Sequence, residues 1–136
     1  MKLLMIYADH FGYQTALKTL PDIPDVAKNE TIENAVLGFI HVEEKDSENQ
    51  GKVITKLIKN LKWLAGKNNT KKIVLHSFSH LSNSKAEPEI VVNIFDQSEQ
   101  RLKDSGYEVS QTPFGYFLAL DLKAPGTPLA RVFKDI

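Results

Sequence analysis

Residues 52–78 read KVITKLIKNLKWLAGKNNTKKIVLHSF, and this stretch decides the fold class. At about 100° per residue, its first half places apolar side chains on one side of a helix and lysines on the other. The pattern predicts a helix over residues 52–65, which Gly66 ends, and then a buried strand over residues 72–78. The predicted packing face consists of Val53, Ile54, Leu57, Ile58, Leu61 and Leu64.

Apolar runs extend this pattern in both directions. Upstream, residues 2–8 and 35–42 predict two strands, with a loop at residues 21–25 between them and a polar connection over residues 43–50 after them. Downstream, the pattern predicts a helix over residues 87–105 and strands over residues 107–112 and 114–122. This order implies an α/β fold: a single domain over residues 1–136, with a mixed β-sheet packed by two main helices.

Composition places the chain among ordinary globular proteins. Its 136 residues are enough for one domain, with 42% hydrophobic and 25% charged residues. The absence of cysteine excludes disulfides and thiolate metal sites. The apolar run at the start is too short for a secretory signal or a membrane span. We therefore expect a cytoplasmic protein with no membrane partner.

Positive charge is concentrated in one segment. Residues 51–86 contain eight lysines and no Asp or Glu, and because the net charge of the whole chain is zero, the other residues carry a net charge of −8. Such a local surplus suits a polyanionic partner, but it is also typical of a solvated helix face. The lysines of the first helix define what we call the basic helix face: Lys52, Lys56, Lys59 and Lys62.

The common catalytic and metal motifs are absent. The sequence has no Gly-rich phosphate loop, no Gly-x-Ser-x-Gly elbow and no His-Glu-x-x-His. His76 and His80 are four residues apart, but the first falls in a strand, the second in the following turn, and no carboxylate lies near them in sequence. We predict no metal site and no cofactor. His10 and His41 are interpreted as packing or surface histidines.

Two segments are candidates for a site. Residues 77–84, SFSHLSNS, follow the third predicted strand, and the carboxyl ends of strands are where α/β folds gather ligands. Alternatively, Ser82, Asn83 and Ser84 make turn and cap hydrogen bonds. Residues 112–119, TPFGYFLA, indicate a tight corner that presents backbone groups to a substrate. We expect the two segments to lie side by side and to form a slot.

Taken in order along the chain, several motifs resemble the editing domain at the N-terminus of archaeal threonyl-tRNA synthetases. These motifs are Tyr7-Ala8-Asp9, GFIHVE at residues 38–43, SFSHLSN at 77–83, Gly106-Tyr107, PFGYFLAL at 113–120 and GTPLAR at 126–131. The resemblance implies a D-aminoacyl-tRNA deacylase-like fold and a homodimer. It also implies removal of serine wrongly attached to threonine tRNA, with the tRNA 3′ end and the rest of a synthetase as partners.

The resemblance assigns roles to several residues. His80 is the polar side chain of the family's pocket that this chain retains, and we predict that it is catalytic. The basic helix face is predicted to bind tRNA. The positions that match the substrate-binding pocket are Val42, Ser77, Ser79, Tyr116, Phe117 and Leu118.

The chain departs from the family's pattern inside this pocket. The family's Tyr-Lys pair is Phe117-Leu118 here, and its last Glu is Arg131. We therefore expect that Arg131 supplies the positive charge lost at Leu118 and is a catalytic residue together with His80. Two alternatives remain open: a catalytically weakened tRNA-binding or structural module, and a deacylase for a different aminoacyl-tRNA.

Overall fold

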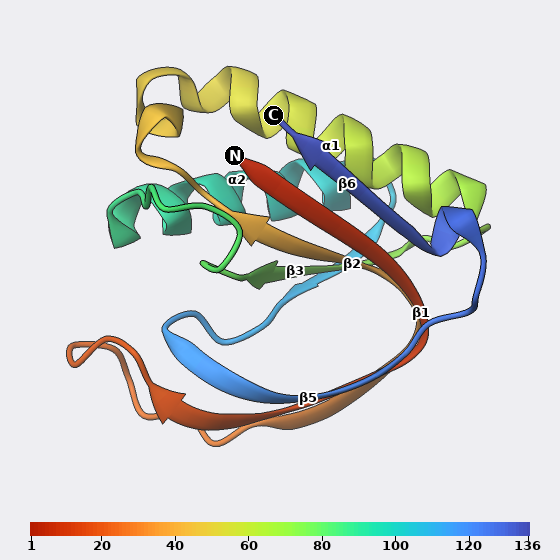
Figure 1. Ribbon diagram of the computed structural model, residues 1–136, viewed down its shortest axis with the longest axis horizontal. Coiled ribbons are helices and arrows are strands. Elements are labelled where there is room, and N and C mark those ends of the chain that lie inside the picture. Colours follow the sequence, from red (N-terminus) through yellow and green to blue (C-terminus); the bar gives the residue numbers. More distant parts are fainter.

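The computed structural model describes residues 1–136 as a strongly bent β-sheet with two helices on one face (Figure 1). Both helices and the mixed sheet agree with the predicted fold class. None of the helices combines the length and apolar composition that a membrane crossing requires. The elements are β1 (Lys2–Lys18), β2 (Asn29–His41), α1 (Gln50–Lys67), β3 (Lys72–Ser77), α2 (Pro88–Asp104), β4 (Glu108–Gln111), β5 (Tyr116–Lys123) and β6 (Arg131–Asp135), with 3₁₀-helices at Glu44–Asn49 and Pro128–Ala130.

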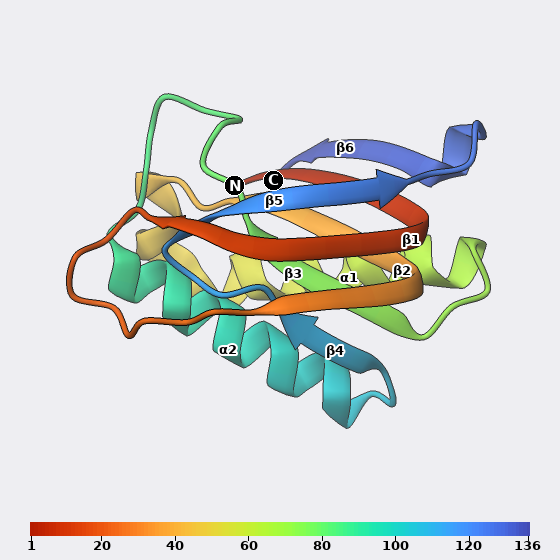
Figure 2. The same cartoon turned by 90° about the horizontal axis from the view of Figure 1, so that it is seen from below.

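The sheet order is β4-β3-β2-β1-β5, and β6 also pairs with β1. Strand β3 runs parallel to β2 and to β4, whereas β1 is antiparallel to β2, β5 and β6. One edge of β1 is shared, because β6 pairs with residues 2–6 and β5 pairs with residues 10–18. Figure 2 shows β2, β1 and β5 side by side in the bent part of the sheet.

Several elements differ from the sequence-based prediction. Strand β1 continues to Lys18, and β2 begins at Asn29. Polar residues such as His10 interrupt the apolar run there, but pairing with β2 and β5 on both sides holds the backbone extended. Residues 131–135 form a strand that was not predicted, and the polar connection at Glu44–Asn49 is a 3₁₀-helix.

The helices bury the face that their periodicity predicts. All six apolar residues of the predicted α1 face are buried, and they form the main core with β1, β2, β3 and α2. A second buried cluster lies on the other face of the sheet and contacts Phe78 and Leu118. This second cluster supports the segments that carry the candidate site.

The two chain ends lie side by side, and the N-terminal amino group is buried (Figure 1). The Met1 ammonium donates to Glu43 Oε1 at 2.8 Å, to Asp46 Oδ1 at 3.0 Å and to the Ile136 carbonyl at 3.1 Å. Two carboxylates thus balance one buried positive charge. Glu43 lies two residues beyond the end of β2 and connects this ion cluster to the candidate site.

Candidate functional site

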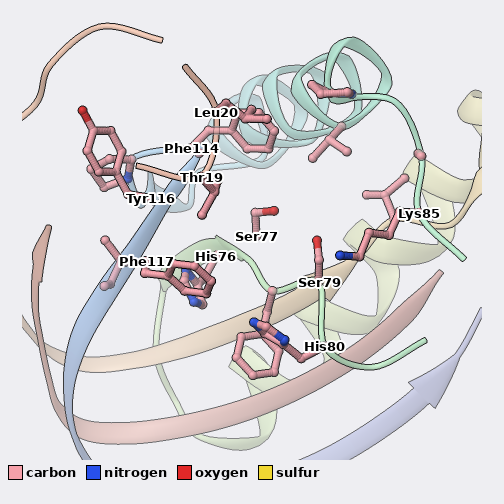
Figure 3. A pocket seen from close by; sticks show the side chains of 18 of the residues that line it. Thr19, Leu20, His76, Ser77, Ser79, His80, Lys85, Phe114, Tyr116 and Phe117 are labelled. Carbon is pink, nitrogen blue, oxygen red and sulfur yellow. The ribbon is translucent and has the colours of Figure 1, made fainter. Parts of the chain in front are cut away.

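The two candidate segments enclose a pocket of about 490 Å³ (Figure 3). Residues 76–80, at the carboxyl end of β3, form one wall, and residues 113–118, at the corner before β5, form another. The expected slot is therefore present, and its size is that of a small-molecule site. Six residues predicted to bind substrate line it: Val42, Ser77, Ser79, Tyr116, Phe117 and Leu118.

A row of aromatic rings positions His80. Its imidazole lies 4.9 Å from the Phe78 ring and 6.2 Å from the Phe117 ring, measured between centroids, and is stacked on the latter. Behind Phe78, the rings of Phe39 and His76 continue the row at 5.2 Å and 5.9 Å. Such ring pairs add to the stabilisation from burial. His80 itself remains exposed, so its imidazole is accessible from the pocket.

His41 fixes the backbone that follows His80. It is fully buried, its Nε2 donates to the Ser84 carbonyl at 2.6 Å, and its Nδ1 accepts from the Leu81 amide at 3.0 Å. These two bonds define a neutral imidazole with its proton on Nε2. The sequence indicated a packing or surface residue, and a histidine inside the apolar run at residues 35–42 was the available signal for a buried polar contact.

Glu43 ties the same loop to the ion cluster. Its Oε2 accepts from Ser82 Oγ at 2.7 Å, and its Oε1 accepts from the Met1 ammonium. Burial alone would raise the pKa of the Glu43 carboxyl, but these two hydrogen bonds and the positive charges of the Met1 ammonium and Lys2 outweigh it and lower that pKa to about 2. Ser82 therefore holds the loop against β2. The alternative interpretation of Ser82 and Ser84 is confirmed for the turn, because the Ser82 hydroxyl accepts from the Ser84 amide at 3.2 Å. It is wrong for the cap of α2, because the residue before that helix is Glu87.

His76 is a second imidazole in the pocket wall, and it is buried. Its Nδ1 lies 2.8 Å from Thr112 Oγ1. Burial, together with the nearby His80, lowers the pKa of His76 to about 4. His76 is therefore neutral at physiological pH, and it positions β3 against the segment before the corner.

The corner itself depends on Gly115 and Tyr116. Gly115 has φ +83° and its carbonyl accepts from the Thr19 amide at 2.7 Å. The Tyr116 hydroxyl donates to the Pro24 carbonyl at 2.6 Å and accepts from the Val26 amide at 2.7 Å. The ring of Tyr116 lines the pocket, but its hydroxyl is occupied in holding the loop between β1 and β2 (Figure 3).

We predict that Gly115→Ala destabilises the corner by about 1–3 kcal/mol, because a side chain is strained at this positive φ. The added Cβ would also lie 2.5 Å from Ile23 Cδ1, which must shift. Urea unfolding measures the change. Gly126→Ala is the matched control, because no atom lies within 4 Å of its added Cβ. Equal stability of both variants would contradict the strain.

The structure places Arg131 away from the pocket, in contrast to the sequence-based expectation. Arg131 does not line the pocket, and its guanidinium donates to the Pro125 carbonyl at 2.8 Å. Strand β6 pairs Arg131 with Ile6, whereas β5 pairs Tyr116 with Lys18, twelve residues further along β1. The expectation that Arg131 supplies a positive charge to the pocket is therefore wrong.

A different cation lines the pocket, and the sequence did not identify it. Lys85, in the loop before α2, directs its amino group toward the pocket beside Ser79 (Figure 3). It belongs to the lysine-rich segment, which was the available signal. No carboxylate lines the pocket, so Lys85 is its one side chain with a permanent charge.

The basic helix face is only partly continuous. Lys52, Lys56 and Lys59 are exposed on α1. Lys62 instead donates to Ser105 Oγ at 2.9 Å and lies 5.9 Å from the centre of the Tyr107 ring. Three of the four lysines are therefore free to meet a polyanion.

Comparison with known proteins adds independent evidence. Threonine–tRNA ligase of Thermococcus kodakarensis is 32% identical over 139 residues, and that of Methanosphaera stadtmanae is 33% identical over 138 residues. Each match covers all of this chain but only 22% of the relative, so the chain spans about a fifth of the length of these ligases.

A solved structure of the c-Myc DNA Unwinding Element Binding Protein superimposes with a TM-score of 0.69 at 9% identity, covering 100% of this chain and 99% of that one. This likeness concerns the fold alone. It agrees with the D-aminoacyl-tRNA deacylase-like fold expected from the sequence. The family model of the archaea-specific editing domain of threonyl-tRNA synthetase matches residues 1–136. The chain therefore belongs to the family of archaea-specific editing domains of threonyl-tRNA synthetase.

Proposed function

We propose that this domain hydrolyses the ester of seryl-tRNA(Thr) and so proofreads the product of a threonyl-tRNA synthetase. The observation that carries the proposal is the pocket between residues 76–80 and 113–118 in a chain of this family. The tRNA 3′ end enters this pocket with the seryl ester beside His80. Hydrolysis requires a polarised carbonyl, a positioned water and a path for a proton.

The pocket contains groups suited to these tasks. His80 is an exposed imidazole, and histidine is the side chain that most often transfers protons in enzymes. Ser77 and Ser79 direct hydroxyls into the pocket (Figure 3). The backbone of Phe117 and Leu118 orients the ester from the opposite wall, and the terminal 2′-hydroxyl of the tRNA itself assists the reaction. His76 stays neutral and supports the wall.

Two other functions have specific support. Phe117 and Leu118 lack a hydroxyl and an ammonium, which favours a module that binds tRNA without catalysis. The same two side chains make the pocket more apolar, which favours a deacylase for another aminoacyl-tRNA.

One assay separates these functions. Purified protein is incubated with seryl-tRNA(Thr) and with threonyl-tRNA(Thr), and release of each amino acid is followed. Fast release of serine with threonine spared supports editing. Hydrolysis of neither ester, together with salt-sensitive tRNA binding, supports the binding module. A panel of other aminoacyl-tRNAs tests the altered deacylase.

The basic helix face is proposed to bind the body of the tRNA. We predict that Lys56→Glu together with Lys59→Glu weakens tRNA binding about 10-fold at moderate salt, because two phosphate contacts become repulsive. Filter binding at several salt concentrations measures the affinity and its salt dependence. Lys28→Glu with Lys123→Glu is the control with the same change of charge. An unchanged affinity of the first variant would assign its lysines to ordinary solvent exposure.

We also propose a cytoplasmic homodimer that works with the rest of a threonyl-tRNA synthetase. Exposed apolar side chains on β5 and β6, including Leu120, Leu122 and Phe133, support an association surface. Light scattering after size-exclusion chromatography measures the mass in solution, and a monomeric mass at all concentrations would remove the dimer from the proposal.

A further inference from the structure

Lys85 is a cation in the pocket wall with no partner of its own. Lys2 and Lys103 form ion pairs with Asp135 and Glu99 at 2.6 Å. Lys85 forms neither an ion pair nor a hydrogen bond, and its side chain is exposed beside Ser79. Its positive charge is therefore available to a ligand.

The charge of the pocket constrains how an aminoacyl-tRNA can bind. The 3′ end of such a substrate carries a positive α-amino group on the amino acid and a negative phosphodiester before the terminal nucleoside. No carboxylate lines the pocket to attract the amino group, and Lys85 repels it. The ammonium of a lysine attracts a phosphate as a point charge.

The position of Lys85 also matters. In Figure 3 it lies across the pocket from Phe117, so it does not occupy the place of the ammonium missing at the neighbouring Leu118. Lys85 belongs to the loop before α2, whereas Phe117 and Leu118 belong to β5. An exposed, flexible lysine on this side suits the phosphodiester that precedes the terminal nucleoside, because this group enters the pocket after the nucleoside.

We propose that Lys85 binds the phosphodiester between the last two nucleotides of the tRNA and is a positioning residue for the 3′ end. The inference rests on the proposed function, because it assumes that the terminal nucleoside occupies the pocket. With the phosphate held at Lys85, the ester faces the wall that carries His80 and the α-amino group points away from the lysine. Lys85 thereby sets the direction in which the 3′ end enters.

The test compares two small ligands that differ by this phosphodiester. Cytidylyl-3′,5′-adenosine and adenosine are each titrated into the wild-type protein and into Lys85→Met, with the ring signals of His80 followed by NMR. Lys85→Met is expected to weaken binding of the dinucleotide about 5- to 10-fold and to leave adenosine binding unchanged. Lys85→Arg retains the charge and is expected to restore dinucleotide binding.

The salt dependence gives a second readout. With whole tRNA as the ligand, Lys85→Met is expected to lower the slope of log affinity against log salt by about 0.7, the value for loss of one phosphate contact in a single strand. The proposal would be overturned if Lys85→Met lost affinity for both ligands equally or kept its affinity for the dinucleotide. It would also be overturned if the wild type did not bind the dinucleotide. None of these measurements needs ester hydrolysis. If Lys85→Met selectively lost affinity for the dinucleotide but the wild type hydrolysed no ester, only the proposed function would be refuted.

Kinetics distinguish positioning from catalysis in an active domain. Lys85→Met is expected to raise KM for seryl-tRNA several-fold with kcat unchanged, because the contact is present in both the ground and transition states. A lowered kcat with unchanged KM would instead assign Lys85 to the chemical step and overturn the positioning role.

Discussion

Replacing His80 by alanine is expected to slow hydrolysis of seryl-tRNA(Thr) about 100-fold, the usual lower range for loss of a group that transfers a proton. The imidazole is exposed, lines the pocket and is held between the rings of Phe78 and Phe117. Single-turnover deacylation measures the chemical step without a contribution from product release.

Two further variants separate chemistry from packing. His80→Phe retains a ring between Phe78 and Phe117 but removes both nitrogens, and we expect it to be as slow as His80→Ala. His10→Ala changes a histidine outside the pocket, between Glu33 and Asp121, and is expected to keep the wild-type rate. A rate for His80→Ala within threefold of the wild type would leave catalysis to the backbone and the 2′-hydroxyl of the tRNA.

Glu43→Gln is expected to lower the free energy of unfolding by about 3 kcal/mol, because removal of one partner of a buried ion pair leaves the other poorly compensated. The Met1 ammonium is fully buried, and only Asp46 would remain as a countercharge. Urea denaturation at neutral pH measures the loss. Glu44→Gln is the matched control, since the Glu44 side chain is exposed. A loss below about 1 kcal/mol, the range of surface pairs, would show that the pair contributes little.

The pH dependence of this effect has a definite sign. The pKa of Glu43 is about 2 in the folded protein, below the ordinary value of 4.5. Its contribution to stability is therefore fully present above pH 4.5, and it is lost as the pH falls from 4.5 toward 2. The difference in unfolding free energy between wild type and Glu43→Gln should shrink over that interval. If the difference in unfolding free energy stayed constant down to pH 2, the effect of Glu43→Gln would not come from the charge of the Glu43 carboxylate.

The helices were predictable from the sequence, and the long strands were not. The spacing of Leu57, Leu61 and Leu64 in α1 reflects a local helical period, and local periodicity is visible in sequence. The second half of β1 and the first half of β2 carry polar residues, and they are strands because they pair with each other and with β5. Strand β6 likewise depends on pairing with the start of β1, which no local pattern reveals.

Some features of the candidate site were likewise predictable from the sequence, and others were not. The pocket wall at His80 and the corner at Gly115 were indicated by local motifs, and the structure places them side by side. The hydrogen bonds of His41 and the place of Lys85 in the pocket wall depend on segments distant in sequence and could not be inferred from it. The expectation for Arg131 was wrong because charge compensation was inferred from the changes at Leu118 and Arg131 relative to the family's pattern, without knowing which strand pairs with which.

The shared edge of β1 determines when the domain can be completed during synthesis. Strand β1 leaves the ribosome well before β5 and β6, yet one of its edges pairs only with these two strands, at residues 116–135. Until those residues emerge, the nascent chain exposes an unpaired strand edge, which is prone to aggregate. Such contacts between the two ends of the chain also give a high contact order, so we expect slow folding for a domain of this size.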